Sequence, residues 1–426
     1  MIDVRLLRQD PAGTRAALLR RGDPSIGTAL DALLELDRRW RAGVAEAEQL
    51  KAERNTHNEE VAKRKRAQLP AEELLTALRA SAERVKRLDA ETRAVEEQLR
   101  IVLLGLPNLP HPQAPTGGPE ANRIVRTWGA PPQFAFTPRP HWDLAEALGI
   151  LDLARGSKLT GSGFPVFMGQ GARLVRALQN LMLDLHTREH GYREVAPPYL
   201  VNRAALTGTG QLPKFEEDLY ASPRDDLFLI PTAEVPLTNL HRDEILDAVA
   251  LPAGFVAFTP CFRREAGAAG KDTRGLLRVH QFDKVELVRL CRPEASDAEH
   301  ELLTGHAETV LQRLELPYRV VELATGDTGF SAARTYDLEV WAAGVRDWLE
   351  CSSSSTFTDF QARRANIRFR PAPGAKPELV HTLNASGVAF ARTIAALLEN
   401  QQDADGTVRV PQALIPYLGA DRLLPG

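Results

Sequence analysis

The pattern of apolar and polar positions near the start of the chain predicts two long helices. Residues 27–66 and 71–104 are rich in charged residues and alanine, and they contain no proline. Because Pro70 stands between them and disfavours a continued helix, we expect an antiparallel helical arm roughly 60 Å long, at about 1.5 Å per residue. In the second segment, apolar or small residues recur at alternating spacings of four and three, which is typical of a coiled-coil seam: Leu74, Leu78, Ser81, Val85, Leu88, Thr92, Val95, Leu99 and Val102.

Downstream of this arm the pattern changes twice. Residues 107–118 are rich in proline and glycine, which favours an exposed linker. Beyond them helix-like and strand-like segments mix, with strands expected at 255–262 and 276–290, so we predict an α+β body built on a mainly antiparallel β-sheet flanked by helices. The predicted division is a domain at 1–106 with the arm at about 27–104, a linker at 107–120 and a body at 121–426. The sequence has neither the glycine fingerprint of a Rossmann unit nor a P-loop motif.

The overall charge excludes a general attraction to nucleic acid. The chain carries 53 lysines and arginines against 56 aspartates and glutamates, a formal net charge of -3. Any contact with nucleic acid must then be local, and Lys63, Arg64, Lys65 and Arg66 place four positive charges at the predicted tip of the arm. Such a run fits a solvated helix end and also a phosphate-backbone contact, and its exposed position on a long lever favours the contact.

Cysteine usage and the lengths of apolar runs bear on the compartment. Cys261, Cys291 and Cys351 are far apart and form no C-x-x-C pair, which disfavours both a disulfide framework and a zinc site made from cysteine. No apolar run approaches the ~20 residues that span a bilayer, and Asp3 and Arg5 stand where a signal peptide needs its apolar core. We therefore expect a soluble cytoplasmic protein that does not contact a membrane.

The segment from Phe262 to Glu286 carries the clearest candidate chemistry. Alternate side chains of an extended strand share a face, so Arg263 and Glu265 should face one way and Arg264 the other, while the following loop supplies Lys271 and Arg274. Cations for the phosphates and an aromatic ring for adenine are what ATP binding without a P-loop requires. A charged surface hairpin is the alternative, and strand parity alone leaves both open. On the returning strand one face should carry Arg278, His280, Phe282, Lys284 and Glu286, and the other Val279, Gln281, Asp283 and Val285.

Several segments together resemble one protein family. The strings F-R-R-E at 262–265 and H-Q-F-D-K-V-E at 280–286 resemble motif 2 of the class II aminoacyl-tRNA synthetases, in the form found in seryl-tRNA synthetases. The helical arm and the segments at 191–198, 208–215, 230–236, 350–353, 384–392 and 410–417 are similar to that family as well. The resemblance covers nearly the whole chain and places motif 1 at about 174–200, motif 2 at about 255–288 and motif 3 at about 384–400.

This resemblance implies an activity and a set of site residues. It implies a homodimeric serine–tRNA ligase that activates L-serine with ATP and Mg²⁺, without zinc, and transfers it to the 3′ end of tRNA(Ser), with tRNA(Sec) as a second candidate. The implied catalytic residues are Arg263, Glu286 and Arg392. The implied ATP-binding residues are Arg263, Arg264, Glu265, Arg274, Val279, His280, Gln281, Phe282, Glu350, Cys351, Ser352, Ser353 and Arg392. The implied serine-binding residues are Thr232, Ala233, Glu234, Arg263, Glu286, Asn384 and Ser386. Glu350 and Ser353 are the implied metal ligands, and Lys63, Arg64, Lys65 and Arg66 the implied tRNA contacts.

The chain departs from the family pattern at a few positions, and other functions remain as alternatives. Arg264 stands where a serine is usual, Cys351 is displaced by comparison with the usual cysteine, and Gly163 and Ala385 also differ. A ligase that loads an amino acid onto a carrier protein would be expected to lack the arm. An inactive nucleic-acid-binding paralogue would be expected to lose Arg263, Glu265, Glu286 or Arg392. Threonine and proline synthetases would be expected to show zinc ligands or an anticodon-binding domain.

Overall fold

The computed structural model describes residues 1–266 and 274–425. The chain divides into two compact units, one of Ile2–Leu19 and Asp23–Pro107 and the other of Met1, Arg20–Gly22 and Asn108–Gly426. Within the described residues, no helix is long and apolar enough to cross a membrane.

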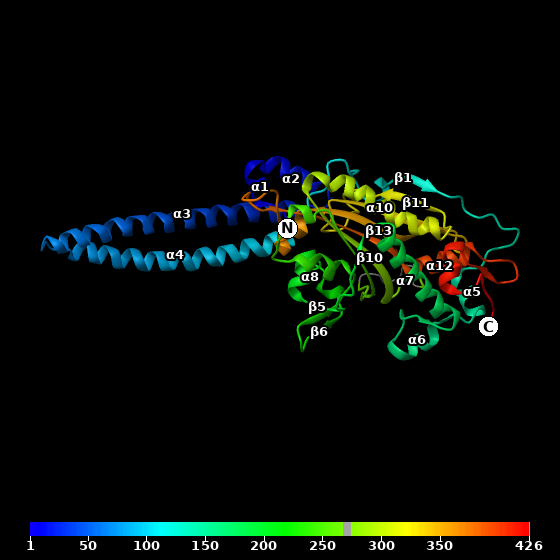
Figure 1. The fold of residues 1–426 in the computed structure, drawn as a ribbon. Coiled ribbons are helices and arrows are strands. Elements are labelled where there is room, and N and C mark those ends of the chain that lie inside the picture. The colour runs from blue at the N-terminus through cyan, green and yellow to red at the C-terminus, as the bar shows by residue number, and fades with distance from the viewer. Residues whose placement is uncertain (267–273, 426) are drawn as a thin grey trace. The chain divides into compact units, whose positions relative to one another are not determined.

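The first unit is dominated by two helices that run antiparallel. Figure 1 shows α3 and α4 packed along their length, as the hydrophobic pattern predicted. Gln68, between them, adopts a positive φ of 56° in the connecting turn. All nine seam positions of the second helix are buried or half-buried, which confirms the coiled-coil pattern. The helices of this unit are α1 (Val4–Gln9), α2 (Pro11–Leu19), α3 (Ser25–Arg66) and α4 (Glu72–Gly105).

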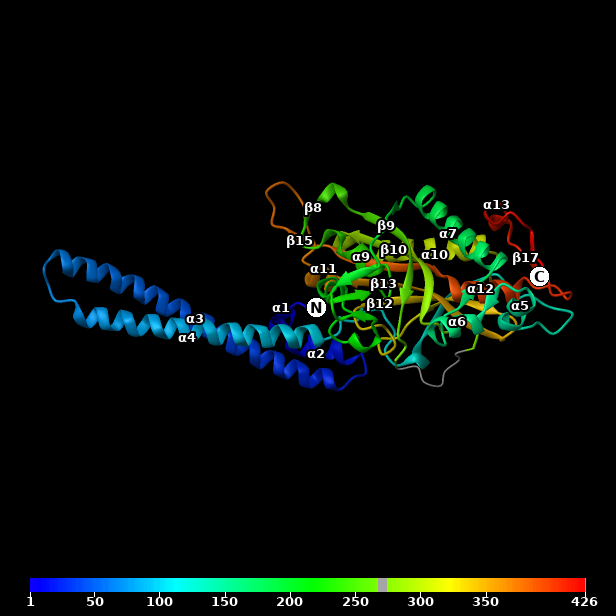
Figure 2. The ribbon, with the colours of Figure 1, turned by 90° about the horizontal axis from the view of Figure 1, so that it is seen from below.

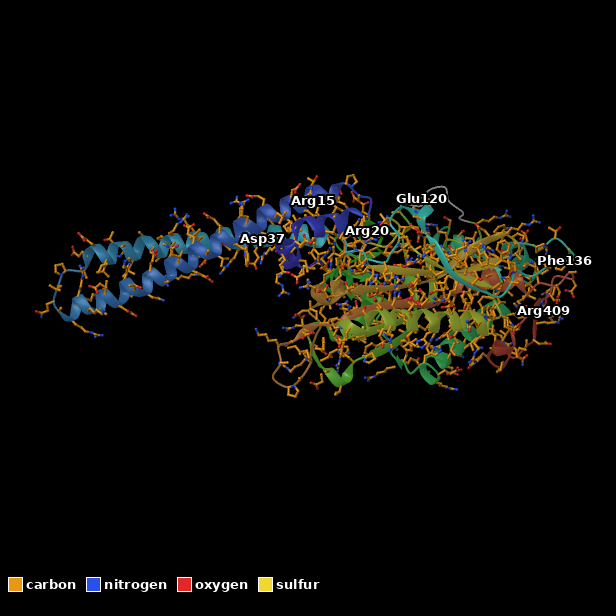
Figure 3. All side chains as sticks on the ribbon, turned by 90° about the horizontal axis from the view of Figure 1, so that it is seen from above. Arg15, Arg20, Asp37, Glu120, Phe136 and Arg409 are labelled. Atoms are coloured by element: carbon orange, nitrogen blue, oxygen red, sulfur yellow. The ribbon has the colours of Figure 1, made fainter. Side chains whose placement is uncertain are left out.

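Most charged side chains of this unit are exposed, but one aspartate in α3 is buried. Asp37, labelled in Figure 3, is 1 % exposed and accepts hydrogen bonds from Arg8 and from Arg41 Nε, the latter at 2.9 Å. Burial alone would raise the pKa of the Asp37 carboxyl, but the hydrogen bonds from the two arginines hold it below its ordinary value. Asp37 thereby ties α1 to the start of the arm.

The second unit is built on one large sheet. Its eight strands run in the order β1-β11-β12-β13-β16-β10-β9-β4, and all neighbours are antiparallel except β4 and β9. The predicted mainly antiparallel α+β fold is therefore confirmed, and Figure 2 shows β9, β10, β12 and β13 of this sheet. The strands are β1 (Arg123–Trp128), β4 (Arg193–Glu194), β9 (Ala253–Phe262), β10 (Gln281–Cys291), β11 (Tyr318–Glu322), β12 (Arg334–Ala342), β13 (Asp347–Thr358) and β16 (His381–Ala389).

One predicted strand begins later than expected. The sequence suggested a strand at 276–290, but β10 begins only at Gln281. The residues before it bond elsewhere, because Leu276 N donates to a histidine side chain and His280 N donates to Gly163 O at 2.7 Å. The turn at residues 274–280 therefore replaces the first part of the predicted strand.

Three helices contribute to the main core with this sheet: α7 (Gln170–Arg188), α10 (Ser296–Arg313) and α12 (Phe390–Asn400). Their apolar side chains, including the fully buried Leu174 and Leu178 of α7, join the strands in one cluster. Every residue of α12 except Arg392 is buried, so this helix lies inside the unit. The three helices fix the sheet that carries the site.

Shorter elements complete the second unit. The other α-helices are α5 (His141–Ala147), α6 (Leu153–Thr160), α8 (Arg203–Thr209), α9 (Glu234–Thr238), α11 (Phe360–Ala365) and α13 (Ile415–Leu418). The smaller sheets contain β2 (Leu151–Asp152), β3 (Val166–Phe167), β5 (Leu200–Asn202), β6 (Ala221–Ser222), β7 (Leu227–Leu229), β8 (Ile245–Asp247), β14 (Arg368–Arg370), β15 (Glu378–Leu379), β17 (Val408–Arg409) and β18 (Arg422–Leu423).

Candidate active site

A cavity of about 720 Å³ opens on the large sheet of the second unit. Side chains from β10, β12, β13 and β16, from the segment after β9 and from the starts of α9 and α12 line it. Its volume is within the usual range for small-molecule sites. The predicted site residues that line it are Thr232, Glu234, Arg263, Glu265, Val279, Phe282, Glu286, Glu350, Cys351, Ser353, Asn384, Ser386 and Arg392. The predicted residues outside the lining are Ala233, Arg264, Arg274, His280, Gln281 and Ser352.

Arg263 follows the end of β9 and presents its guanidinium to the cavity. Its Nε donates to Pro231 O at 3.3 Å, and its Cζ lies 5.2 Å from the centre of the Phe282 ring. Among the described residues it forms no ion pair with a carboxylate, so the charge is available to an anion. Nearby, Glu265 accepts a hydrogen bond from Arg278, and both of these side chains line the cavity.

The neighbours of this arginine divide between the cavity and the surface. Arg264 N donates to Asp218 O at 3.0 Å, and the Arg264 side chain is exposed away from the lining. His280 Nδ1 lies 3.0 Å from Arg263 O, and the His280 ring packs near Phe164. Because residues 274–280 form a turn, strand parity holds from Phe282 onward but fails at positions 279 and 280.

Arg274 lies outside the cavity over an aromatic ring. Its Cζ is 4.6 Å from the centre of the Trp142 ring, and its Nη2 is 4.0 Å from Asp143 Oδ1. The other cation predicted for this loop, Lys271, lies outside the described residues. The structure therefore places the predicted mobile cation Arg274 beside α5 and not among the cavity residues.

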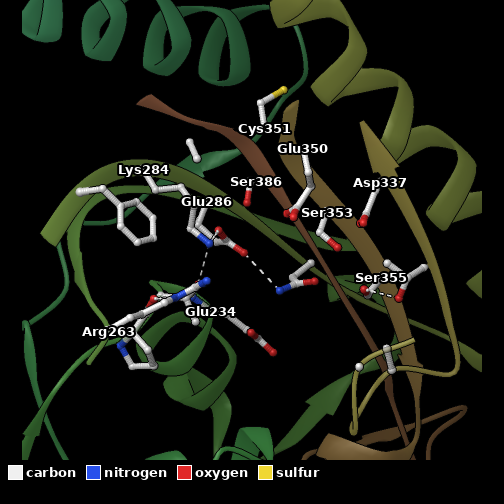
Figure 4. A pocket seen from close by; sticks show the side chains of 18 of the residues that line it. Glu234, Arg263, Lys284, Glu286, Asp337, Glu350, Cys351, Ser353, Ser355 and Ser386 are labelled. Carbon is white, nitrogen blue, oxygen red and sulfur yellow. Dashed lines mark hydrogen bonds and ion pairs between the residues drawn. The ribbon is translucent and has the colours of Figure 1, made fainter. Parts of the chain in front are cut away.

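Two buried carboxylates and a lysine form the acidic side of the cavity (Figure 4). Lys284 Nζ lies 2.5 Å from Glu286 Oε2 and donates to Thr232 Oγ1 at 3.0 Å. Glu286 Oε1 accepts from Asn384 Nδ2 at 3.1 Å, whereas its Oε2 has the ionic contact but no well-aligned donor among the described residues. Two carboxylates, Glu234 and Glu286, against one ammonium leave a net charge of about -1 when both are ionised, which suits a cationic ligand.

Glu234 is the titrating member of this group. It begins α9, and its Oε1 accepts from Gln361 Nε2 at 2.6 Å. Burial, followed by repulsion from Glu286, raises the pKa of Glu234 to about 7, although Gln361, Lys284 and Arg263 oppose the shift. The net charge of the acidic side therefore changes near neutral pH.

A third group gathers on β12 and β13. Glu350 and Ser353 are three residues apart, and in a regular strand they would face opposite ways. The register with β12 shifts so that Leu338 pairs with Ser352 and Glu339 with Glu350, leaving Cys351 as an extra residue. This β-bulge allows both side chains to face the cavity.

Asp337 joins this group, although the sequence gave no motif for it. It pairs in register with Ser353, lines the cavity, and its Oδ1 is buried with no hydrogen-bond partner in the described part of the chain. Burial and then the nearby Glu350 carboxylate raise the pKa of Asp337 well above its ordinary value. Side chains of β12 alternate between the two faces of the sheet, and Asp337 pairs with the predicted Ser353. This alternation is the sequence signal that could have identified Asp337 as a site residue.

Arg392 connects this group to the motif 2 segment. Its Nη1 donates to Glu350 O at 2.7 Å and to Glu350 Oε2 at 3.2 Å, and its Nε donates to Leu277 O at 3.1 Å. Cys351 is 1 % exposed, and its Sγ donates to Leu338 O, which agrees with the raised pKa of this buried thiol. Ser352 donates to Ser386 O at 2.6 Å from outside the lining.

Carboxylate and hydroxyl oxygens of Asp337, Glu350 and Ser353 suit a hard divalent cation. In residues 1–266 and 274–425, no group of three or more His, Cys, Asp and Glu side chains is arranged to hold a metal ion by itself. Mg²⁺ is usually bound by one or two carboxylates together with water and substrate phosphates. The orphaned Asp337 Oδ1 and the two neighbouring oxygen ligands fit that kind of site.

Comparison with known proteins defines the class. Residues 214–401 match the family described as "tRNA synthetase class II core domain (G, H, P, S and T)". This match agrees with the antiparallel sheet and with the convergence of motif 2 and motif 3 on its cavity. The second unit therefore contains a class II aminoacyl-tRNA synthetase core.

The particular family follows from the remaining matches. Residues 1–110 match the "Seryl-tRNA synthetase N-terminal domain". The Serine–tRNA ligase of Gemmatimonas aurantiaca is 58 % identical over 98 % of this chain and 99 % of its own. Seryl-tRNA synthetase from Pyrococcus horikoshii, solved in complex with ATP, superposes with a TM-score of 0.96 at 40 % identity over 100 % of both chains. The cytoplasmic Serine-tRNA ligase of Naegleria fowleri, solved with AMP, has a TM-score of 0.88 at 29 % identity over 99 % of this chain and 98 % of its own. The chain belongs to the seryl-tRNA synthetase family, which confirms the predicted resemblance.

Proposed function

We propose that this protein is a serine–tRNA ligase, which activates L-serine with ATP and transfers it to tRNA(Ser). The observation that carries the proposal is that motif residues from separate segments converge on one cavity with cations on one side and buried carboxylates on the other. The relatives named Serine–tRNA ligase match over nearly the whole chain, including the arm. Neither the carrier-protein ligase nor the inactive paralogue receives support from these comparisons.

The cationic side of the cavity suits the triphosphate. Arg263 and Arg392 come from motif 2 and motif 3 and would neutralise charge that develops on the α-phosphate. The Phe282 ring would stack on adenine, and Glu265 with Arg278 would border it. Glu350, Ser353 and Asp337 would hold Mg²⁺, which supplies further charge neutralisation to the phosphate oxygens when bound.

The acidic side suits the amino acid. The ammonium group of serine would lie between Glu234 and Glu286, and the carboxylate would face Arg263. Ser386 and Glu286 would bond the hydroxyl, with Asn384 orienting the Glu286 carboxylate. Lys284 would hold the Glu286 carboxylate in place, because it bonds both that carboxylate and Thr232.

The first step is in-line attack by the serine carboxylate on the α-phosphorus, with pyrophosphate as the leaving group. No protein nucleophile is needed, so positioning and charge neutralisation supply the rate. In the second step a terminal ribose hydroxyl of tRNA attacks the adenylate carbonyl, and AMP leaves.

The remaining predicted partners belong to the same proposal. We assign the tRNA contact to Lys63–Arg66 in the last turn of α3, where three of the four side chains are exposed. We assign the interface between two copies to motif 1 (residues 174–200), which contains most of α7 and the edge strand β4. The division at residues 106 and 120, zinc independence and the cytoplasmic location remain predictions.

The overall reaction tests this proposal. The purified chain is incubated with ATP, Mg²⁺, labelled serine and tRNA, and acid-precipitable label is measured. We expect label on tRNA(Ser) that base hydrolysis releases, as an ester must. Label that requires a carrier protein in place of tRNA would support the ligase alternative.

Activity should depend on the ionisation of Glu234. Because the ammonium of serine needs an ionised partner, kcat/KM for serine should rise about tenfold per pH unit below pH 7 and level off above it. Glu234→Gln should remove this inflection and lower kcat/KM for serine by roughly 10²-fold, since a charged hydrogen bond is lost. The pH profile of pyrophosphate exchange with subsaturating serine measures both effects.

Asp283→Asn is the matched control for that experiment. Burial also raises the pKa of Asp283, but this side chain does not line the cavity. The control should keep the inflection. An inflection near pH 7 that survives in Glu234→Gln would exclude Glu234 as its source.

A further inference from the structure

A buried histidine outside the cavity contacts the segment that leads into β10. His141, the first residue of α5, is 0 % exposed, and its Nδ1 lies 2.7 Å from Glu399 Oε1 in α12. The same Glu399 oxygen accepts from His141 N at 2.8 Å, while Glu399 Oε2 accepts from Gly344 N at 2.8 Å and from Val345 N at 3.0 Å. Since both carboxylate oxygens act as acceptors, the His141 Nδ1 must carry the proton in this contact.

The other nitrogen of His141 then acts as an acceptor. In a neutral imidazole protonated at Nδ1, Nε2 has a free lone pair, and it accepts from Leu276 N at 3.0 Å. Gly275 allows the close approach, because its φ is +67° and a Cβ there would lie 2.3 Å from His141 Nε2. This bond holds a backbone N–H that has no strand partner, since β10 begins at Gln281.

Helix α12, which contacts Leu276 through Glu399 and His141, also contacts the same motif 2 segment directly. Arg392, in the first turn of α12, donates through Nε to Leu277 O at 3.1 Å. Glu399, near the other end of α12, acts on the adjacent Leu276 through His141. Two consecutive residues of motif 2 are thus tied to two positions of the motif 3 helix.

Two further residues of α5 contact Arg274, the cation that precedes Leu276. Trp142 lies under Arg274, and Asp143 is 4.0 Å from the same guanidinium. Leu276, Leu277 and the next two residues, Arg278 and Val279, all line the cavity. The position of the segment on α5 therefore determines where Arg278 stands relative to Glu265.

We infer that His141 is a positioning residue for ATP activation, which aligns the motif 2 segment with the motif 3 helix by bridging Glu399 and the Leu276 N–H. The inference rests on the proposed function, because ATP is assigned to this cavity there. His141 itself does not line the cavity and takes no part in the chemistry. Its loss should affect ATP more than serine, because residues 274–279 border the cationic side, whereas Glu234 lies in α9 and Glu286 lies further along β10.

Two substitutions separate positioning from simple core support. The amide of His141→Asn can reproduce the Nδ1 donor to Glu399 but cannot reach Leu276, whereas the longer His141→Gln places its amide near the former Nε2 and can accept from Leu276. We expect His141→Asn to lower kcat/KM for ATP in serine-dependent pyrophosphate exchange by roughly 10²-fold, as expected for a misplaced binding group. KM for serine should stay within about twofold of its original value. His141→Gln, which keeps the bond to Leu276 but gives up the Nδ1 donor to Glu399, should recover part of the loss.

His300→Asn is the control for loss of a buried histidine. His300 is 1 % exposed and donates through Nε2 to Ser354 O at 3.0 Å, and within the described part of the chain it forms no hydrogen bond with residues 274–278. The His300→Asn substitution should lower the melting temperature without changing KM for ATP. Equal losses in His141→Asn and His141→Gln, or a lowered melting temperature with unchanged ATP parameters, would overturn the inference. Absence of serine-dependent exchange in the unaltered chain would instead contradict the proposed function.

Discussion

Arg263→Gln is expected to lower serine-dependent exchange of pyrophosphate into ATP by roughly 10³-fold or more, within the range for removing a preorganised group that stabilises transition-state charge. Arg263 lines the cavity with no carboxylate partner among the described residues, so its guanidinium is available to the α-phosphate and to the serine carboxylate. Because both substrates would contact it, kcat should fall and both KM values should rise. Steady-state exchange kinetics with each substrate varied in turn measure these effects.

Arg264→Gln provides a matched control at the next position. It removes the same charge from a side chain that is exposed and outside the cavity lining, and its structural bond to Asp218 is made by the backbone N–H. The expected loss is less than about threefold, since exposed charges away from a site interact weakly. Comparable losses in the two variants would show that general charge, and not the placement of Arg263, supports the reaction.

Deleting residues 27–104 as a unit should abolish transfer to tRNA while adenylate formation continues within about threefold. α3 and α4 pack chiefly on each other, and the deletion removes almost the whole of both helices together. Charging of tRNA should fall by roughly 10³-fold or more if the arm supplies the phosphate contacts that dominate nucleic-acid affinity. Parallel exchange and charging assays on the same preparation give the ratio of the two activities.

A second variant tests the tip while it keeps the arm. Replacing Lys63, Arg64, Lys65 and Arg66 with glutamine removes four charges from the last turn of α3. The salt dependence of tRNA binding should become shallower by up to about one unit of log–log slope for each lost phosphate contact. For the deletion of residues 27–104, equal losses of pyrophosphate exchange and of tRNA charging would contradict the role assigned to the arm.

The sequence predicted the elements whose pattern is long and regular. The seam from Leu74 to Val102 predicted α4 because a buried stripe along a helix repeats its spacing many times. The alternation from Phe282 to Glu286 placed three side chains correctly on the cavity face, since residues 281–291 form one continuous strand. Parity could not extend to Val279 and His280, because a turn held by bonds to the His141 side chain and to the Gly163 carbonyl replaces the strand there.

The parts that could not be predicted depend on long-range contacts. The bulge at Cys351 is visible only in the register of β13 against β12, and it alone explains how Glu350 and Ser353 can share a face. The bond between His141 and Glu399 joins residues 258 positions apart, so no local pattern marks it. Arg274 was expected at the phosphates from its charge, but the Trp142 ring, distant in sequence, offers it another position.

The most direct test of the account is the exchange of labelled pyrophosphate into ATP by the unaltered chain with serine, threonine and alanine in parallel. We predict strong stimulation by serine and roughly 10⁴-fold less by alanine, because alanine leaves the groups that bond the serine hydroxyl without a partner. Threonine should also stimulate weakly, since its extra methyl group would crowd the pocket at Ser386 and Glu286. Exchange that is absent, or that the three amino acids stimulate equally, would contradict the assignment of this cavity to serine activation.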